Sequence, residues 1–220
     1  MNLMGRLLKE GINAHYATGS RAFTGTLRNI IGPRGSVQFK FFNSYGDADA
    51  DAVDVLICDE AHRIRRTSSN MYTPRAQRTD KPQIDELVHA ARVSVFFIDD
   101  DQVVRPDEIG SSELIRTRAR AASAEIGEFE LEAQFRCAGS DAFVNWVNNT
   151  LGIRRTANPI WTGAENFDFR IIGSPGEAED LIRARAAEGY SARMTAGFCW
   201  PLSKHPRPDG TLEYDVKICD

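Results

Sequence analysis

The sequence lacks any apolar run long enough to cross a membrane. Its longest apolar stretches, such as Val93–Ile98 interrupted only by Ser94, fall far short of the roughly 20 residues that span a bilayer. The first eleven residues carry Arg6 and Lys9 where a signal peptide needs an uninterrupted apolar core, and they lack a small-residue cleavage site. These absences predict an unexported, cytoplasmic protein that has no membrane partner.

Cysteine is also scarce. The chain has only four cysteines, far apart and without a C-x-x-C pair, which excludes a disulfide framework and a zinc cluster. Hydrophobic residues make up 42% of the chain, against 17 glycines and 9 prolines, which excludes collagen-like, low-complexity and wholly disordered proteins. A length of 220 residues predicts one large domain, or one domain and part of a second.

Lysine is rare, and arginine supplies most of the positive charge. There are 5 lysines and 22 arginines, and the formal net charge is −4. The planar guanidinium group grips phosphate through two hydrogen bonds, so an arginine excess fits a nucleic-acid partner. A codon bias gives the same excess without any function, and the negative net charge excludes a chain that is basic as a whole. Composition therefore leaves the partner open.

Strands and helices are predicted to alternate along the chain. Apolar or alternating strands are expected at 12–18, 37–42, 53–58, 93–99, around Phe129 and Leu131, and at 167–172. Helices are expected at 2–10, 21–31, 83–92, 111–124, 140–151 and 175–188. This alternation predicts an α/β fold with a parallel sheet and helices on its faces.

Two carboxylates follow the most apolar strand. The segment VDVLICDEAHRIR, residues 53–65, ends its apolar run at Asp59 and Glu60. Ligands of open parallel sheets bind at the carboxyl ends of strands, so both side chains are placed for chemistry. Asp59 is expected to hold Mg²⁺, directly or through water, and Glu60 to orient and deprotonate an attacking water. An acidic turn after a core strand is the alternative interpretation.

Two further segments carry polar groups at expected strand ends. The segment VSVFFIDDDQVV runs into Asp99 and Gln102, whose amide can contact a phosphate oxygen or a water. Arg136, in ELEAQFRC, is placed to stabilise transition-state charge across a cleft. A polar strand end and a solvated surface arginine are the alternatives. The basic stretch 63–92 either follows a phosphate backbone or forms a solvated loop.

Taken in order, DEAH after one strand, D-x-x-Q after the next and L-E-x-Q-F-R beyond them resemble motifs II, III and IV of superfamily 1 helicases. The sequence resembles most closely the Schlafen group 3-like DNA/RNA helicase domain. The segments that carry this resemblance, over nearly the whole chain, are HYATGSRAF (15–23), FFIDDDQVV (96–104), QFRCAGSDAFVNWV (134–147) and AGFCWPLS (196–203).

The resemblance implies a RecA-like P-loop NTPase that binds ATP and Mg²⁺ and acts on DNA or RNA. Residues 1–135 would form a partial first RecA-like domain, and 136–220 a linker helix and the start of a second. By this resemblance Glu60, Gln102 and Arg136 are catalytic, and Asp59 is the metal ligand. The remaining assignments place His62 and Asp99 with Asp59 in the nucleotide site, and Thr18, Ser20 and Arg21 at the nucleic acid. Ser20 is equally explained as a helix cap.

The chain departs from this family's pattern at both ends, because the phosphate-loop motif is missing and the sequence stops before any Q-G-x-E-type segment or final catalytic arginine. No G-x-x-x-x-G-K-[ST] pattern occurs, although that phosphate loop (Walker A) cradles the triphosphate in P-loop proteins. Three interpretations stay open. The chain is a fragment without the Walker A strand and loop, which would leave unpaired strand edges and an inactive ATPase; it is a binding module that does not hydrolyse ATP; or a neighbouring polypeptide supplies the loop.

Overall fold

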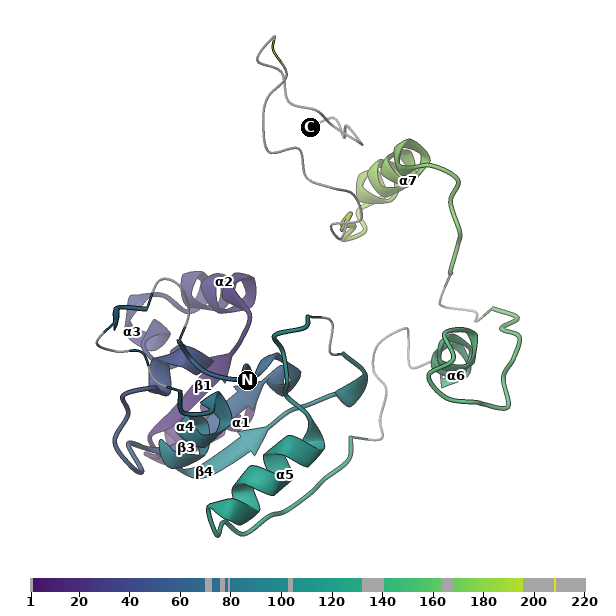
Figure 1. Cartoon of the computed structure of the whole chain (residues 1–220). Coiled ribbons are helices and arrows are strands. Elements are labelled where there is room, and N and C mark those ends of the chain that lie inside the picture. Colours follow the sequence, from purple (N-terminus) through teal and green to yellow (C-terminus); the bar gives the residue numbers. More distant parts are fainter. Residues whose placement is uncertain are drawn as a thin grey trace. The chain divides into compact units, whose positions relative to one another are not determined.

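The computed structural model describes residues 2–69, 73–75, 78, 80–102, 105–131, 141–163, 168–195 and 208 (Figure 1). The chain divides into two compact units, Met1–Glu130 and Leu131–Asp220. The first unit contains the sheet and the residues around the DEAH segment, and the described part of the second contains two helices. Among the described helices, none is both long and apolar enough to cross a membrane.

The first unit is built on a parallel sheet of four strands in the order β2-β1-β3-β4. The strands are β1 (Ala14–Thr18), β2 (Phe39–Phe41), β3 (Val53–Asp59) and β4 (Ala91–Phe96). The predicted α/β class and parallel sheet are confirmed, and the arrangement is compatible with a RecA-like fold. Within the described residues β2 and β4 form the two edges, and Val93 on β4 is 53% exposed.

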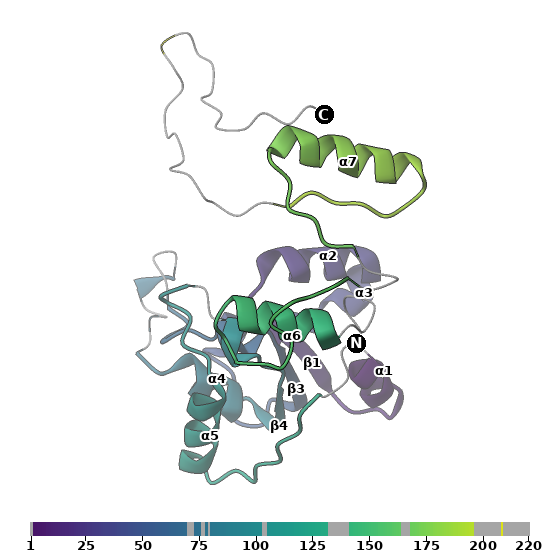
Figure 2. The ribbon, with the colours of Figure 1, turned by 90° about the vertical axis from the view of Figure 1, so that its right-hand side faces the viewer.

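Both faces of the sheet are covered, which explains the continuous apolar run in β3. Leu56 and Cys58 point into one core cluster, while Ile57 points into a second, because successive side chains of a strand face opposite ways. Helices from both sides of the sheet complete these layers (Figure 2). The first cluster includes residues of α4 (Gln83–His89) and α5 (Ser112–Ala121), and the second includes residues of α1 (Asn2–Lys9) and α2 (Arg21–Ile31).

Serine caps begin three of the described helices, and the predicted cap at Ser20 is among them. Ser20 accepts a hydrogen bond from the backbone N–H of Phe23 at the start of α2, over 3.4 Å. Ser111 and Ser174 cap α5 and α7 in the same way. The remaining elements are α3 (Pro33–Ser36), η1 (Phe42–Tyr45), η2 (Ala61–Arg63), η4 (Asp100–Gln102), α6 (Asp141–Thr150) and α7 (Pro175–Ala187).

Two predicted strands are wrong. Phe129 and Leu131 lie in irregular chain with exposures of 95% and 81%, and the described part of 167–172 is irregular too. Alternating side chains make a strand only where a neighbouring strand offers hydrogen bonds. No strand occurs among the residues described in the second unit, so a second α/β domain is not seen there.

Candidate functional site

Asp59 is the last residue of β3 and lies beside β1. Its Cα pairs in register with that of Thr18, so the ends of the two strands meet at one edge of the sheet. The phenol of Tyr16, a buried residue of β1, donates a hydrogen bond to Oδ2 of Asp59. Burial, and secondarily this bond to the carboxylate, raise the pKa of Tyr16 well above its ordinary value. The phenol therefore remains a donor at any physiological pH, and it occupies Oδ2 of Asp59.

Glu60 has an unusual backbone conformation. Its φ of 56° and ψ of 46° are left-handed, which is uncommon for a residue other than glycine. The turn reverses the chain directly into the short helix η2. Arg63 Nε donates to Glu60 Oε2 over 3.4 Å, and Nε2 of His62 lies 3.3 Å from the same oxygen. One oxygen of the predicted base is therefore shared by two neighbours within the DEAH turn.

His62 is buried, with 2% of its surface exposed. Its Nδ1 has no hydrogen-bond partner among the described residues. Gly110 packs against the turn so closely that a Cβ there would overlap the carbonyl oxygen of Ala61 and lie 2.8 Å from Cα of His62. The imidazole is thus fixed inside the fold, beside Glu60, and is not presented to solvent.

Backbone hydrogen bonds join Phe97, which directly follows β4, to Cys58 and Ala61 on either side of Asp59 and Glu60. Phe97 N–H donates to the carbonyl of Cys58, and Ala61 N–H donates to the carbonyl of Phe97, both over 2.9 Å. Beyond this junction the Gln102 amide donates to Oδ2 of Asp99 over 2.8 Å. No hydrogen bond or ion pair within the described chain joins that pair to Asp59 or Glu60.

The Thr18–Arg21 segment joins β1 to α2. Thr18 is buried, and its hydroxyl accepts a hydrogen bond from the N–H of Ser20 over 3.2 Å. Ser20 caps α2, which confirms its structural interpretation, while Arg21 is exposed. A nucleic-acid contact in this segment stays a prediction. Arg136 lies outside the described residues.

The residues present fit Mg²⁺ as an ion held mainly by water and phosphate. Within the described ranges no three His, Cys, Asp or Glu side chains come together to hold a metal. Asp59 offers one oxygen that Tyr16 does not occupy. Mg²⁺ in nucleotide sites keeps several waters and takes one or two carboxylates, so a single oxygen is sufficient.

Sequence reasoning missed three residues that contact the DEAH motif. Tyr16 and Gly110 reach it from distant segments, and no pattern in the sequence indicates either contact. Arg63 directly follows the motif, so its position in the sequence could have indicated its contact with Glu60. Its Nη1 also lies 3.9 Å from Oε1 of Glu108, a buried carboxylate in the segment that follows Gln102.

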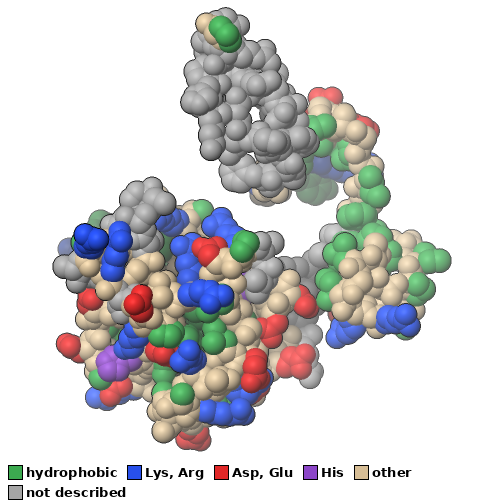
Figure 3. All heavy atoms as spheres, viewed as in Figure 1, with side chains coloured by type: hydrophobic (Ala, Val, Ile, Leu, Met, Phe, Trp, Pro, Cys, Tyr) green, Lys and Arg blue, Asp and Glu red, His purple; other side chains and the backbone are tan. Residues whose placement is uncertain are grey.

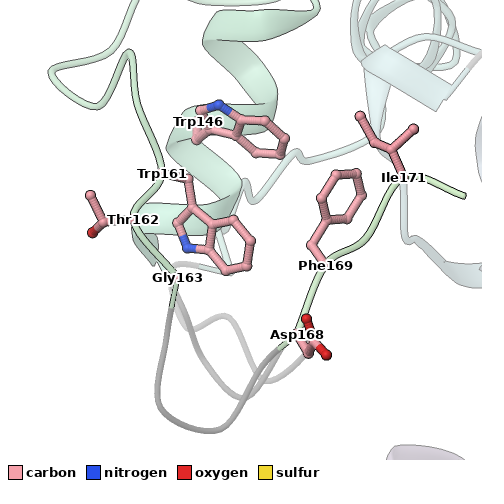
Figure 4. A pocket seen from close by; sticks show the side chains of 7 residues that line it. All are labelled: Trp146, Trp161, Thr162, Gly163, Asp168, Phe169 and Ile171. Atoms are coloured by element: carbon pink, nitrogen blue, oxygen red, sulfur yellow. The ribbon is translucent and has the colours of Figure 1, made fainter.

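None of the predicted site residues is among the described residues that line an open pocket of the second unit. This pocket has a volume of about 680 Å³, and Trp146, Trp161 and Phe169 point their rings toward one another there (Figure 4). Among the described residues that line it, Asp168 is the one that carries a charge. On the face of the molecule in Figure 3, basic side chains of the first unit lie among acidic ones and do not form one separate patch.

A comparison with known families now adds to this geometry. Residues 1–219 match the family described as Schlafen group 3, DNA/RNA helicase domain. The chain belongs to this family. No curated protein matches the chain. Membership in the Schlafen group 3 helicase-domain family bears out the sequence resemblance, and it associates the chain with helicases and nucleic acid in general.

Proposed function

We propose that the chain provides the hydrolytic carboxylates of an ATP-dependent, DNA- or RNA-linked helicase-like NTPase. One observation carries this proposal. Asp59 and Glu60 stand at the end of a strand buried on both faces, and Glu60 adopts a left-handed turn with its carboxylate held by His62 of the same motif and by Arg63, which follows it. Strained conformations of this kind concentrate at functional sites.

The proposed chemistry gives each side chain a separate task. Asp59, held by Tyr16, would bind Mg²⁺ through its other oxygen or through water. The ion, when bound with ATP, neutralises charge on the phosphates. Glu60 would accept a proton from water as the water oxygen bonds to the γ-phosphorus and the bond to the β–γ bridging oxygen breaks.

The other predicted residues complete the proposed nucleotide site. Gln102 would contact the γ-phosphate after leaving Asp99, and Arg136 would stabilise the developing charge. His62 would transmit the position of Glu60 to the core in which it is buried. These assignments follow from family membership and from the strand ends on which the described residues lie.

We propose that the nucleic acid contacts the Thr18–Arg21 segment through Ser20 and Arg21, while the buried Thr18 anchors the segment to the sheet. This segment begins beside Asp59, because Thr18 is its partner in the sheet. Arg21 supplies an exposed cation for a phosphate group. The neighbouring backbone N–H groups at the start of α2 favour an anion as well. A strand of DNA or RNA here would lie beside the DEAH turn.

ATP hydrolysis also needs a phosphate-binding loop, which the 220 residues do not contain as G-x-x-x-x-G-K-[ST]. We propose that an adjoining segment or a neighbouring polypeptide supplies it. The first test compares ATP binding and hydrolysis by the 220-residue chain with those of a version extended by the coding sequence upstream of it. Turnover by the extended protein alone supports the proposal. Turnover by the shorter chain would reveal a phosphate site of another kind.

The test of the residues uses Glu60→Gln in whichever protein hydrolyses ATP. Turnover is expected to fall by about 100-fold or more, since a positioned general base contributes about 10² to 10⁴. ATP affinity should stay within about twofold, because the amide keeps the shape of the carboxylate. Asp107→Asn, which changes an exposed carboxylate paired with Arg65, is the matched control and should leave turnover intact. Unchanged hydrolysis by the Glu60 variant would refute its role.

A non-hydrolysing nucleic-acid or protein interaction module is the second candidate, favoured by the sequence that lacks the phosphate-loop pattern. It predicts salt-dependent binding of single-stranded DNA or RNA without ATP. No hydrolysis by either protein, together with such binding, would select this candidate. Absence of binding at low ionic strength would exclude its nucleic-acid form.

A further inference from the structure

Arg63 contacts the segment in which we place the nucleic acid. A Cβ on Gly19 would lie 2.6 Å from Cβ of Arg63 and 3.3 Å from its Cδ. The two residues can approach so closely only because residue 19 has no side chain. A displacement of the Thr18–Arg21 segment toward Arg63 would therefore push directly on the Arg63 side chain.

The Arg63 guanidinium lies between two carboxylates. Its Nε is 3.4 Å from Oε2 of Glu60, and its Nη1 is 3.9 Å from Oε1 of Glu108. The Glu108 side chain is 2% exposed, and its Oε2 has no hydrogen-bond partner among the residues that the structure describes. Arg105, the other cation near it, is 4.0 Å from Oε1. A buried carboxylate with an unused oxygen favours a closer cation.

We propose that Arg63 is a positioning residue that couples nucleic-acid binding to Glu60. This inference rests on the proposed function. Without nucleic acid, Arg63 holds Oε2 of Glu60. A phosphate backbone bound along Thr18–Arg21 displaces Gly19 against Arg63, whose guanidinium then moves to Glu108. Among the described neighbours His62 alone still contacts Oε2 of Glu60, and the carboxylate can then accept a proton from water.

Both contacts are longer than a charge-assisted hydrogen bond of about 2.7–2.9 Å, so neither is at its best geometry. Coupling between two sites is also reciprocal, since each event changes the other by the same factor. If nucleic acid weakens the Arg63–Glu60 pair, then removal of this pair must strengthen nucleic-acid binding. The inference can therefore be tested by binding alone, on the 220-residue chain and without ATP hydrolysis.

The test is a double-mutant cycle read by fluorescence anisotropy of a labelled oligothymidylate of about 20 nucleotides, at low salt, where phosphate contacts are strongest. In the wild-type background, Glu60→Gln should tighten binding about threefold, the size of a partly exposed ion pair. In the Arg63→Gln background, the same change should alter the affinity by much less. The cycle removes the general effect of deleting a negative charge, because both backgrounds contain it.

The matched control is the Arg65–Asp107 ion pair. Its Nε and Oδ2 atoms are also 3.4 Å apart, and both side chains are exposed. Asp107→Asn and Arg65→Gln should act additively on oligonucleotide affinity. Glu108→Gln, with its fold checked by circular dichroism, should abolish the coupling between Glu60 and Arg63, because the second acceptor is weakened.

The outcomes separate this inference from the proposed function. Additive effects of Glu60→Gln and Arg63→Gln on binding would overturn the inference alone. Full coupling in the Glu108→Gln protein would overturn the part played by Glu108. If the wild-type chain binds no oligonucleotide even at low salt, the nucleic-acid part of the proposed function is overturned, and the coupling fails with it.

Discussion

Replacing Gly110 with alanine is expected to destabilise the first unit strongly. A Cβ at this position would overlap the carbonyl oxygen of Ala61 and lie 2.8 Å from Cα of His62. Both obstacles belong to the backbone, so no side-chain rotation relieves them. Gly110 is also fixed on its own side, where its N–H donates to the carbonyl of Ile64 over 3.2 Å. The added methyl group must therefore move η2 away from its place.

The magnitude follows from the nature of the obstacle. Adding a methylene to a packed core costs about 1–3 kcal/mol, and rigid surroundings favour the upper part of that range. We expect a loss of about 3 kcal/mol in the free energy of unfolding, out of a total on the order of 5–15 kcal/mol. For a unit of this size the melting temperature should fall by roughly 10 °C.

The assay is urea unfolding followed by circular dichroism, with Gly25→Ala as the matched control. Gly25 lies inside α2, and a Cβ there would meet no other atom within 4 Å. This second change should stabilise the protein by about 0.5–1 kcal/mol, because alanine loses less conformational entropy in a helix. Wild-type stability of the Gly110 variant, or an equal loss in both variants, would refute the packing argument.

Three further predictions test other contacts. Glu86 is buried in α4, and desolvation raises its pKa. The hydrogen bond from Ser68 and the charge of Lys81 lower this pKa, whereas the charges of Asp47 and Asp85 raise it further. The folded state therefore binds this proton more tightly than the unfolded state, so Glu86 lowers stability as the pH rises through the folded-state pKa. Glu86→Gln should add about 1 kcal/mol at pH 8 and little at pH 4 in urea titrations; equal effects at both pH values would contradict this. Tyr16→Phe should lower the free energy of unfolding by about 1.5–3 kcal/mol, because the hydrogen bond to the Asp59 carboxylate is lost. At pH 10–11 the folded wild-type protein should show no extra phenolate absorbance over this variant, because burial raises the pKa of Tyr16. Extra absorbance would show that burial does not keep the phenol protonated. Ser20→Ala should cost about 0.5–1 kcal/mol in the same titrations as a lost helix cap, and a loss of oligonucleotide affinity besides would support the nucleic-acid role of this segment.

The central sheet could be predicted because its strands carry strong local patterns. The apolar run of β3 indicates burial on both faces, and the structure places Leu56 and Ile57 in opposite core clusters. Phe129 and Leu131 show the same kind of alternation, yet they lie exposed. Nearby Glu128 instead forms a two-point ion pair with Arg116 of α5, at 2.7 and 3.1 Å. A pairing partner is a non-local property, and the pattern of a single segment does not reveal it.

The candidate site divides in a similar way. Chain order and the parallel sheet are sufficient to place Asp59 and Glu60 at a carboxyl edge, and the same reasoning places Thr18 nearby. The partner of Asp59 could not be predicted, because Tyr16 is 43 residues away and a tyrosine in a strand ordinarily indicates core packing. The contact of Gly110 with η2 has the same origin, since it depends on how a distant loop returns to the turn.

The conformation of Glu60 depends on residues outside its motif. A left-handed backbone in a glutamate costs on the order of 1 kcal/mol and persists only where the surroundings determine it. Two glycines do so here: Gly110 packs on Ala61 and His62, and Gly19 packs on Arg63, so that the turn after Glu60 is confined by neighbours at which any side chain would collide. The proposed chemistry belongs to the residues of DEAH, whereas the backbone of the turn is confined by these close approaches. We therefore expect Gly110→Ala or Gly19→Ala to change the backbone conformation of Glu60, although the motif itself is intact.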